Sequence, residues 1–151
     1  MPRRAKFWPL VLSLETQRSA RINWKAFEYC ERLKRIFAYV SDHPQEPLSL
    51  RKAAGLANLE RVYFSKYFQR NVGVSLKYWV DFLRVQRAAK LLRESDKSVL
   101  EIAFEVGFMD PSTFIRVFCR IAGTTPQRYR DDRKPSAGGS VVRSQEDNNR
   151  R

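Results

Sequence analysis

The sequence contains few of the residues that build metal centres, disulfide networks or nucleophilic active sites. Among its 151 residues are two cysteines, Cys30 and Cys119, and one histidine, His43. These are too few for a Cys/His zinc site or a disulfide network, and so little cysteine fits a reducing compartment. They also offer no nucleophile paired with a base. We therefore expect a cytoplasmic protein that is not an enzyme, with no cofactor, metal site or catalytic residues.

The sequence also lacks a hydrophobic run long enough to span a bilayer. The longest apolar stretch near the start covers residues 7–14 and is interrupted by Pro9 and Ser13. A spanning helix needs about 20 apolar residues. No small-residue cleavage site follows the stretch, so it does not read as a secretion signal. We therefore expect no membrane partner.

Positive charge is the main excess in the composition. The chain has 29 Lys and Arg residues against 16 Asp and Glu, which gives a formal net charge of +13. Such an excess favours an anionic partner. By itself it does not distinguish DNA, RNA and an anionic membrane surface.

Charge and composition divide the chain into three parts. Residues 1–27 carry six basic residues and a single acidic one, and we interpret them as a basic N-terminal arm. Residues 28–133 are mixed in charge and rich in apolar residues, as a folded domain is. Residues 134–151 are dominated by Pro, Ser, Gly, Asn and charged residues, a composition that predicts a disordered C-terminal tail.

The middle part has the periodicity of α-helices. From Glu28 onward, apolar residues recur at spacings of three and four with charged residues between them. Capping residues, Gly and Pro mark the ends of the helices. The expected helices span residues 28–43, 50–57, 60–71, 76–93, 99–105, 111–122 and 126–133. The longest has apolar residues on almost every side, so we expect an all-α fold in which this helix is buried between two smaller units.

An internal repeat with a spacing near fifty residues is the strongest signal in the sequence. Five residues recur in order: Phe64, Lys66, Phe68, Gly73 and Ser75 return as Phe114, Arg116, Phe118, Gly123 and Thr125. Each copy reads as a short helix, a tight turn and a second helix, and the turn residues Asn58 and Gly107 both tolerate a left-handed backbone. This arrangement is typical of a helix-turn-helix, whose second helix enters the DNA major groove. One copy alone would fit an ordinary helical hairpin, but two copies in a basic chain favour DNA binding.

The second helix of each copy has one apolar face and one mixed face. We expect the apolar faces to pack inward, namely Tyr63, Phe64, Tyr67 and Phe68 in the first copy and Phe114, Val117, Phe118 and Ile121 in the second. The outer faces combine hydrogen-bonding, small apolar and cationic side chains, a mixture that suits base edges, thymine methyl groups and phosphates. The predicted DNA-binding residues are Arg61, Val62, Ser65, Lys66, Gln69 and Arg70 in the first copy and Ser112, Thr113, Ile115, Arg116 and Arg120 in the second.

Within this set the side chains divide into two roles. We assign the phosphate contacts to backbone N–H groups at the helix starts and to the cations Lys66, Arg70, Arg116 and Arg120. We assign the base contacts to Val62, Ser65, Ser112 and Thr113. Arg116 is a further candidate for a base contact. For any single position, a solvated surface residue explains the sequence equally well. Two matching faces are better explained as readers of DNA.

The stretch from residue 33 to 132 resembles the DNA-binding domain of the AraC/XylS family of regulators. Residues 102–130, IAFEVGFMDPSTFIRVFCRIAGTTPQRYR, follow that family's pattern of Ile-Ala, Val-Gly-Phe, Phe-x-Arg-x-Phe, Gly-x-x-Pro and Tyr-Arg. The first copy, LSLRKAAGLANLERVYFSKYFQRNVGVSL, is similar to the more variable half of the family's domain. The resemblance implies seven helices, with two recognition helices joined by a long central helix and placed in successive major grooves on one side of the DNA.

Four positions depart from the family pattern, and one of them, Val62, puts an apolar tip on the first reading helix. Asn58 stands where glycine is usual and Glu60 where a serine cap is frequent, so we expect a less regular first turn. Cys119 stands where Lys or Arg is common, which predicts one weaker phosphate contact. Only about 30 residues precede the match, and many members carry an effector-binding domain there. The chain then reads either as a short regulator controlled by its own abundance or as a piece of a longer ancestor.

The sequence therefore predicts a transcription regulator that binds specific double-stranded DNA, acts as an activator beside RNA polymerase and is a monomer on its operator. Two alternatives stay open. One is a regulator fragment that docks on another protein through residues 7–14, and the other is a non-specific architectural DNA binder. RNA is a weaker candidate, because the deep and narrow groove of A-form RNA does not admit a reading helix.

Overall fold

The computed structural model describes residues 21–133, and this part of the chain contains helices and turns but no strand. Residues 1–20, which hold most of the predicted arm, and the predicted tail at 134–151 lie outside the described residues. The helices are α2 (Ala26–Tyr29), α3 (Glu31–Asp42), α4 (Leu50–Ala57), α5 (Arg61–Val72), α6 (Leu76–Glu94), α7 (Val99–Glu105), α8 (Pro111–Ala122) and α9 (Pro126–Arg133). The predicted all-α fold is confirmed. None of these helices combines the length and the apolar character needed to cross a membrane.

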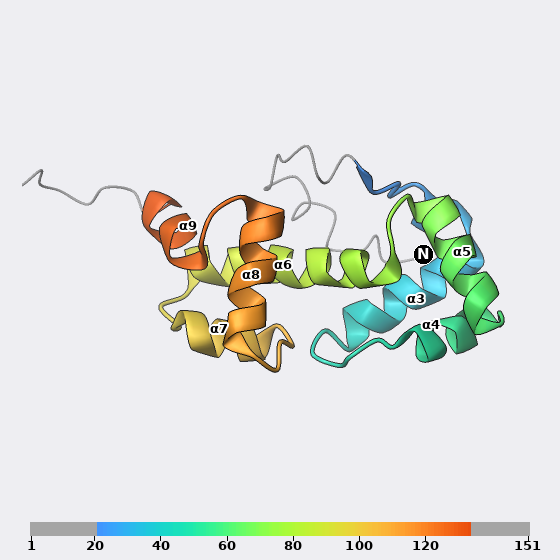
Figure 1. Ribbon diagram of the computed structural model, residues 1–151, viewed down its shortest axis with the longest axis horizontal. Coiled ribbons are helices and arrows are strands. Elements are labelled where there is room, and N and C mark those ends of the chain that lie inside the picture. Colours follow the sequence, from blue (N-terminus) through green and yellow to red (C-terminus); the bar gives the residue numbers. More distant parts are fainter. Residues whose placement is uncertain (1–20, 134–151) are drawn as a thin grey trace, which may run out of the picture.

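Helix α6 runs through the middle of the molecule and joins two groups of helices (Figure 1). Helices α2 to α5 gather near its N-terminal end and are called the first unit below; helices α7 to α9 pack along its other half and are called the second unit. Both units bury side chains of α6, from Trp79 and Phe82 to Ala88 and Leu92. The predicted burial of the long helix between two units is confirmed.

Aromatic side chains fill the cores of both units. Trp79 of α6 stacks on Phe27 with ring centroids 4.9 Å apart, and the ring of Phe68 on α5 lies 5.7 Å from that of Trp79. In the second unit, Phe114 and Phe118 of α8 lie 5.7 Å apart. The phenylalanines that the repeat aligns are fully buried in both units, so the predicted inward face is confirmed for them.

Side-chain caps begin six of the described helices, and the cap of α5 is Glu60. Ser49, Ser75 and Ser98 each accept a hydrogen bond from the backbone N–H three residues further on, at 3.1 to 3.2 Å, before α4, α6 and α7. Asp110 and Thr125 accept the equivalent bonds before α8 and α9, at 2.9 and 3.3 Å. A cap satisfies backbone N–H groups that the first turn leaves unpaired. The helix starts predicted at residues 50, 76, 99, 111 and 126 are confirmed.

The single helix predicted from Glu28 is interrupted at Cys30. Helix α2 ends at Tyr29, Cys30 adopts an extended backbone with φ −106° and ψ 110°, and α3 begins at Glu31. The described residues therefore hold eight helices where the sequence predicts seven. The apolar spacing continues across the break, so periodicity alone does not reveal it. A tertiary contact accompanies the break, because Sγ of Cys30 lies 2.6 Å from the hydroxyl of Tyr67 on α5.

The packed domain also begins earlier than the predicted boundary at residue 28. Ile22 and Phe27 are buried, although the sequence assigns them to the arm. The backbone N–H of Asn23 donates to the carbonyl of Val72 at 2.8 Å, which fixes this segment to the end of α5. The carbonyl oxygen of Arg21 lies 2.6 Å from where a Cβ on Gly73 would stand, and Gly73 has φ +88°. Ile22, Asn23 and Phe27 therefore pack on the helical domain, whereas the predicted domain begins at residue 28.

The two helix-turn-helix turns share a residue with positive φ and one backbone hydrogen bond. Asn58 has φ +53° and Gly107 has φ +100°, so both adopt the left-handed conformation that the sequence predicts. In each unit the next residue donates its N–H to the carbonyl five positions back, at 3.0 Å. The repeat in the sequence is thus a repeat of structure.

Candidate nucleic-acid interface

Helices α5 and α8, the second helices of the two units, are held in place by α6. Figure 1 shows both of them lying across the direction of α6, α5 beside its beginning and α8 over its later half. Helix α6 has 19 residues, so at 1.5 Å per residue it is about 28 Å long. Both units therefore pack their second helix against this one central helix.

All six predicted residues of α5 are exposed: Arg61, Val62, Ser65, Lys66, Gln69 and Arg70. Phe64 and Phe68 face the core as predicted, but Tyr63 does not, because 58% of it is exposed. Tyr63 lies about 100° around the helix from Phe64, and its ring centroid lies 6.4 Å from that of Tyr67 one turn further on. Its aromatic character suggested burial, whereas its position places it beside the predicted DNA-binding residues. Tyr63 is therefore a surface residue that the sequence analysis missed.

The predicted residues of α8 divide by exposure. Four of them are exposed, namely Ser112, Ile115, Arg116 and Arg120. Thr113 is half-buried, and its hydroxyl donates to Asp110 at 2.7 Å, so it belongs to the helix start more than to the outer face. Cys119 is half-buried as well.

Carboxylates occupy the starts of both helices. Glu60 accepts hydrogen bonds from the N–H groups of Val62 and Tyr63 at 2.9 and 3.1 Å. Asp110 accepts them from Ser112 and Thr113 at 3.3 and 2.9 Å. The expectation of a less regular first turn is therefore wrong, because Glu60 caps α5 in place of serine. At each helix start two N–H groups are bonded to a carboxylate.

These caps also shift the acidity of the two carboxyls. Hydrogen bonds from the N–H groups of Val62 and Tyr63 lower the pKa of Glu60. The hydroxyl and the N–H of Thr113 lower the pKa of Asp110. Both shifts favour the ionised carboxylate, which also interacts favourably with the positive end of the helix dipole.

The first recognition helix is anchored from the side by Tyr67. Its hydroxyl is hydrogen-bonded to the thiol of Cys30. Burial together with this hydrogen bond raises the pKa of Tyr67 to about 12. One turn further along α5, the backbone carbonyl of Asn71 accepts a hydrogen bond from the side-chain amide of Asn23, at 3.0 Å. The outer face of α5 is therefore fixed relative to the core by contacts from residues 23 to 30.

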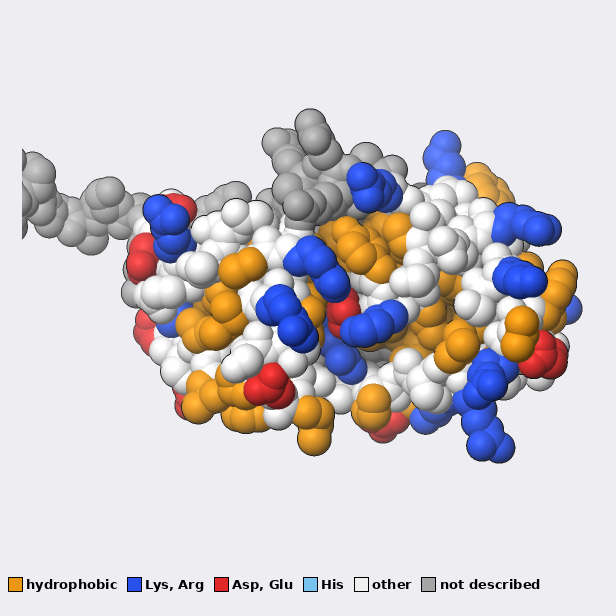
Figure 2. Space-filling model, viewed as in Figure 1, with side chains coloured by type: hydrophobic (Ala, Val, Ile, Leu, Met, Phe, Trp, Pro, Cys, Tyr) orange, Lys and Arg blue, Asp and Glu red, His pale blue; other side chains and the backbone are white. Residues whose placement is uncertain are grey.

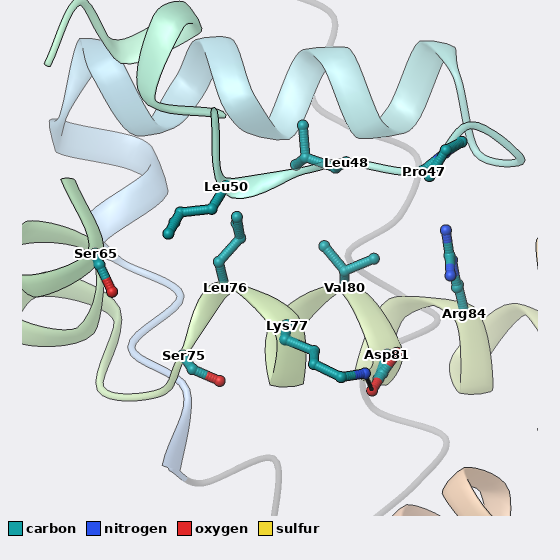
Figure 3. A pocket seen from close by; sticks show the side chains of 10 residues that line it. All are labelled: Pro47, Leu48, Leu50, Ser65, Ser75, Leu76, Lys77, Val80, Asp81 and Arg84. Carbon is teal, nitrogen blue, oxygen red and sulfur yellow. Dashed lines mark hydrogen bonds and ion pairs between the residues drawn. The ribbon is translucent and has the colours of Figure 1, made fainter. Parts of the chain in front are cut away.

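Between α5 and α8 the polar side of α6 adds charged residues that the sequence analysis missed. Lys77, Asp81 and Arg84 are spaced by four and three residues and share one side of the helix. They line a hollow of about 430 Å³ whose other wall is formed by residues 47–50 and Ser65 (Figure 3). Figure 2 shows Lys and Arg side chains gathered over the middle of this face around an acidic patch. The spacing along α6 was the available signal, and the apolar residues of that helix obscured it.

Arg84 connects this hollow to the turn of the second unit. Its guanidinium lies 5.6 Å from the ring centre of Phe108, and burial lowers its pKa. A Cβ on Gly107 would meet the Gln45 carbonyl oxygen at 3.2 Å and Nε of Arg84 at 3.3 Å. The turn therefore needs glycine for its positive φ and for this close approach.

Comparisons with known proteins agree with this geometry. The family model of a helix-turn-helix domain matches residues 53–132. The regulatory protein PocR of Salmonella typhimurium is 35% identical over 99 residues, which cover 66% of this chain and 33% of PocR. The transcriptional regulator MtrA of Neisseria gonorrhoeae is 32% identical over 102 residues, 68% of this chain and 34% of MtrA. The chain thus spans about a third of the length of these curated relatives.

A solved structure extends the comparison to a complex. The DNA-binding domain of the global transcriptional factor AdpA, solved with a target DNA, superimposes with a TM-score of 0.63 and 31% identity, covering 67% of this chain and 91% of that domain. These relatives are regulators and DNA-binding domains, and none is an enzyme. With its two equivalent turns, buried central helix and paired outer faces, the chain belongs to the AraC/XylS family of transcription regulators and carries that family's double helix-turn-helix DNA-binding domain.

Proposed function

We propose that the chain binds specific double-stranded DNA by inserting α5 and α8 into successive major grooves, and that it activates transcription. The observation that carries the proposal is the equivalence of the two units. Their turns share a residue with positive φ and one backbone hydrogen bond, and both recognition helices are packed on the same buried helix. A rigid pair of exposed reading faces suits a two-part site on one side of a duplex.

Each recognition helix contributes base readers and cations. Val62 and Ser65 of α5, with Ser112 and Arg116 of α8, are exposed and are proposed to contact base edges. Thr113 has a smaller role than the sequence suggested, because its hydroxyl is bonded to Asp110. Four exposed cations are proposed to contact phosphates, namely Arg61, Lys66, Arg70 and Arg120. Gln69 and Ile115 complete the two faces.

The spacing of the two helices leads to a further expectation about the DNA. Entries into successive major grooves lie about 34 Å apart, whereas α6, which separates the helices, is about 28 Å long. We infer that the duplex bends toward the protein when both helices are inserted. The energetic cost of such a bend depends on the sequence being bent, so it adds to specificity.

The domain is proposed to comprise residues 21–133 and to bind as a monomer, with RNA polymerase as its protein partner. Leu100 and Phe104 of α7 lie one turn apart and are each 51% exposed. Exposed apolar side chains at such spacing support a contact with another protein.

Selection of bound fragments from random duplex DNA tests the proposal. We expect a two-part site whose parts lie about one helical turn apart. Tight binding without enrichment and with a steep dependence on salt would instead indicate an architectural DNA binder. Failure to bind any duplex would favour a fragment that acts by docking on another protein.

A further inference from the structure

A buried carboxylate lies under the cations between the two recognition helices. The side chain of Asp81 on α6 is 6% exposed, and its Oδ2 lies 3.1 Å from Nζ of Lys77 and 3.5 Å from Nη2 of Arg120. The two cations are 81% and 57% exposed. Their charged ends are therefore at the surface, while the carboxylate that pairs with both lies beneath them.

The position of this cluster relates it to the DNA-binding face. Lys77 and Asp81 line the hollow between α6 and the first unit, together with Ser65 of α5 and Arg84 (Figure 3). Arg120 reaches Asp81 from α8, so the cluster spans the space between the two recognition helices. A duplex that both helices enter must pass its backbone over this place. The carboxylate of Asp81 here lies among three cations, Lys77, Arg84 and Arg120, and cancels part of their charge.

Resting on the proposed function, we propose that Asp81 is a specificity-determining residue. It weakens non-specific DNA binding more than it weakens operator binding. It holds Lys77 and Arg120 in fixed positions and neutralises part of their charge. It does not contact DNA and acts through these two side chains. Operator binding then depends more strongly on the base contacts of α5 and α8.

The physical basis is the release of counterions. Each phosphate that a cation neutralises changes the slope of log K against log salt concentration by about −0.9. On an operator the two recognition helices fix the register, so the cations stay where Asp81 places them. On any other sequence, side chains freed from Asp81 reach whichever phosphate is nearest. Removing the carboxylate therefore strengthens non-specific binding more than operator binding.

The direct test is Asp81→Asn, which removes the charge and keeps the shape of the side chain. Glu94→Gln is the matched control, because Glu94 also lies on α6 and pairs with a lysine four residues away, Lys90, at 3.9 Å, outside the cluster. Binding is measured by fluorescence anisotropy over a salt series, on a scrambled duplex and on a duplex selected from random DNA. Thermal unfolding checks that each variant is folded.

We expect Asp81→Asn to bind the scrambled duplex several-fold more tightly, with a salt slope steeper by about 0.9 for each freed cation. Binding to the selected duplex should change less, and Glu94→Gln should match the wild-type protein on both. Weaker binding by Asp81→Asn on the scrambled duplex, or no change from the control, would overturn the proposal. Failure of the wild-type protein to bind either duplex would instead refute the proposed function.

A second variant keeps the inference testable if Asp81→Asn does not fold. With Asp81 present, Lys77→Gln should weaken binding to the scrambled duplex less than Lys66→Gln, because Lys77 is already paired. A loss from Lys77→Gln that equals or exceeds the loss from Lys66→Gln would show that Asp81 does not restrain this cation.

Discussion

The two units share a left-handed turn residue and the buried phenylalanines of the second helix, and they differ in the elements that cover them. Asn58 and Gly107 adopt the same left-handed conformation, and carboxylates cap the helix that follows each turn. The first unit is closed by α2, α3 and residues 22–27, and the second by α9. The turn geometry therefore defines the unit, because it sets the angle of the recognition helix. The covering elements and the exposed face vary around it.

The largest expected effect tests whether the two cores are equivalent. Phe68 and Phe118 occupy matching positions and are fully buried. We expect Phe68→Ala and Phe118→Ala each to lower the free energy of unfolding by about 3–5 kcal/mol, because each leaves a cavity. Denaturant unfolding measures both. A loss below about 1 kcal/mol at only one of the two positions would contradict the equivalence.

A second comparison concerns the turn residues. Gly107→Ala should destabilise the fold by roughly 2 kcal/mol, because alanine is strained at positive φ and its Cβ would crowd Gln45 and Arg84. Asn58→Gly should change stability by less than about 1 kcal/mol, because that backbone already suits glycine. Thermal unfolding checks both values.

Gly55 provides the control for the loss of a glycine. It lies within α4, and a Cβ there would meet nothing within 4 Å. Gly55→Ala should therefore stabilise the protein by about 0.8–1 kcal/mol. If Gly107→Ala behaved in the same way as Gly55→Ala, the requirement for glycine in the second turn would be refuted.

A third comparison concerns the equivalent cations Lys66 and Arg116. Arginine can bind guanine with two parallel hydrogen bonds, whereas lysine acts as a point charge. We expect Arg116→Ala to cost about 1–3 kcal/mol at the selected site and to relax the preference at one base pair. Lys66→Ala should weaken binding to all sequences alike. Binding to a set of single-base variants separates the two patterns, and a uniform loss for Arg116→Ala would exclude its role in base reading.

The smallest expected effect concerns the two capping carboxyls. The pKa values of Glu60 and Asp110 are lowered in the folded protein, so their contribution to stability is complete above the ordinary carboxyl range. It is lost as pH falls through their folded-state pKa values. The double variant Glu60→Gln, Asp110→Asn should therefore be less stable than the wild-type protein at neutral pH, and this difference should shrink below about pH 4. A difference that is independent of pH would argue against ionised caps.

Local signals in the sequence predicted the repeat, the caps and the fully buried phenylalanines. Caps and left-handed turns depend on residues close together in the chain, so a single sequence is enough to find them. Cys30 and Asn23 both contact α5, and local periodicity does not record such contacts. Asp81 shows the same limit, because its partner Arg120 comes from a helix 39 residues away.

The central claim is that α5 and α8 engage one duplex at the same time. Hydroxyl-radical footprinting on a selected duplex tests it directly, with the wild-type protein and with Arg116→Ala. We predict two protected segments on one face of the DNA, centred about 10 base pairs apart, and loss of protection at one segment in Arg116→Ala. A single protected segment in the wild-type protein would contradict the claim, because it would show that only one recognition helix reads the DNA.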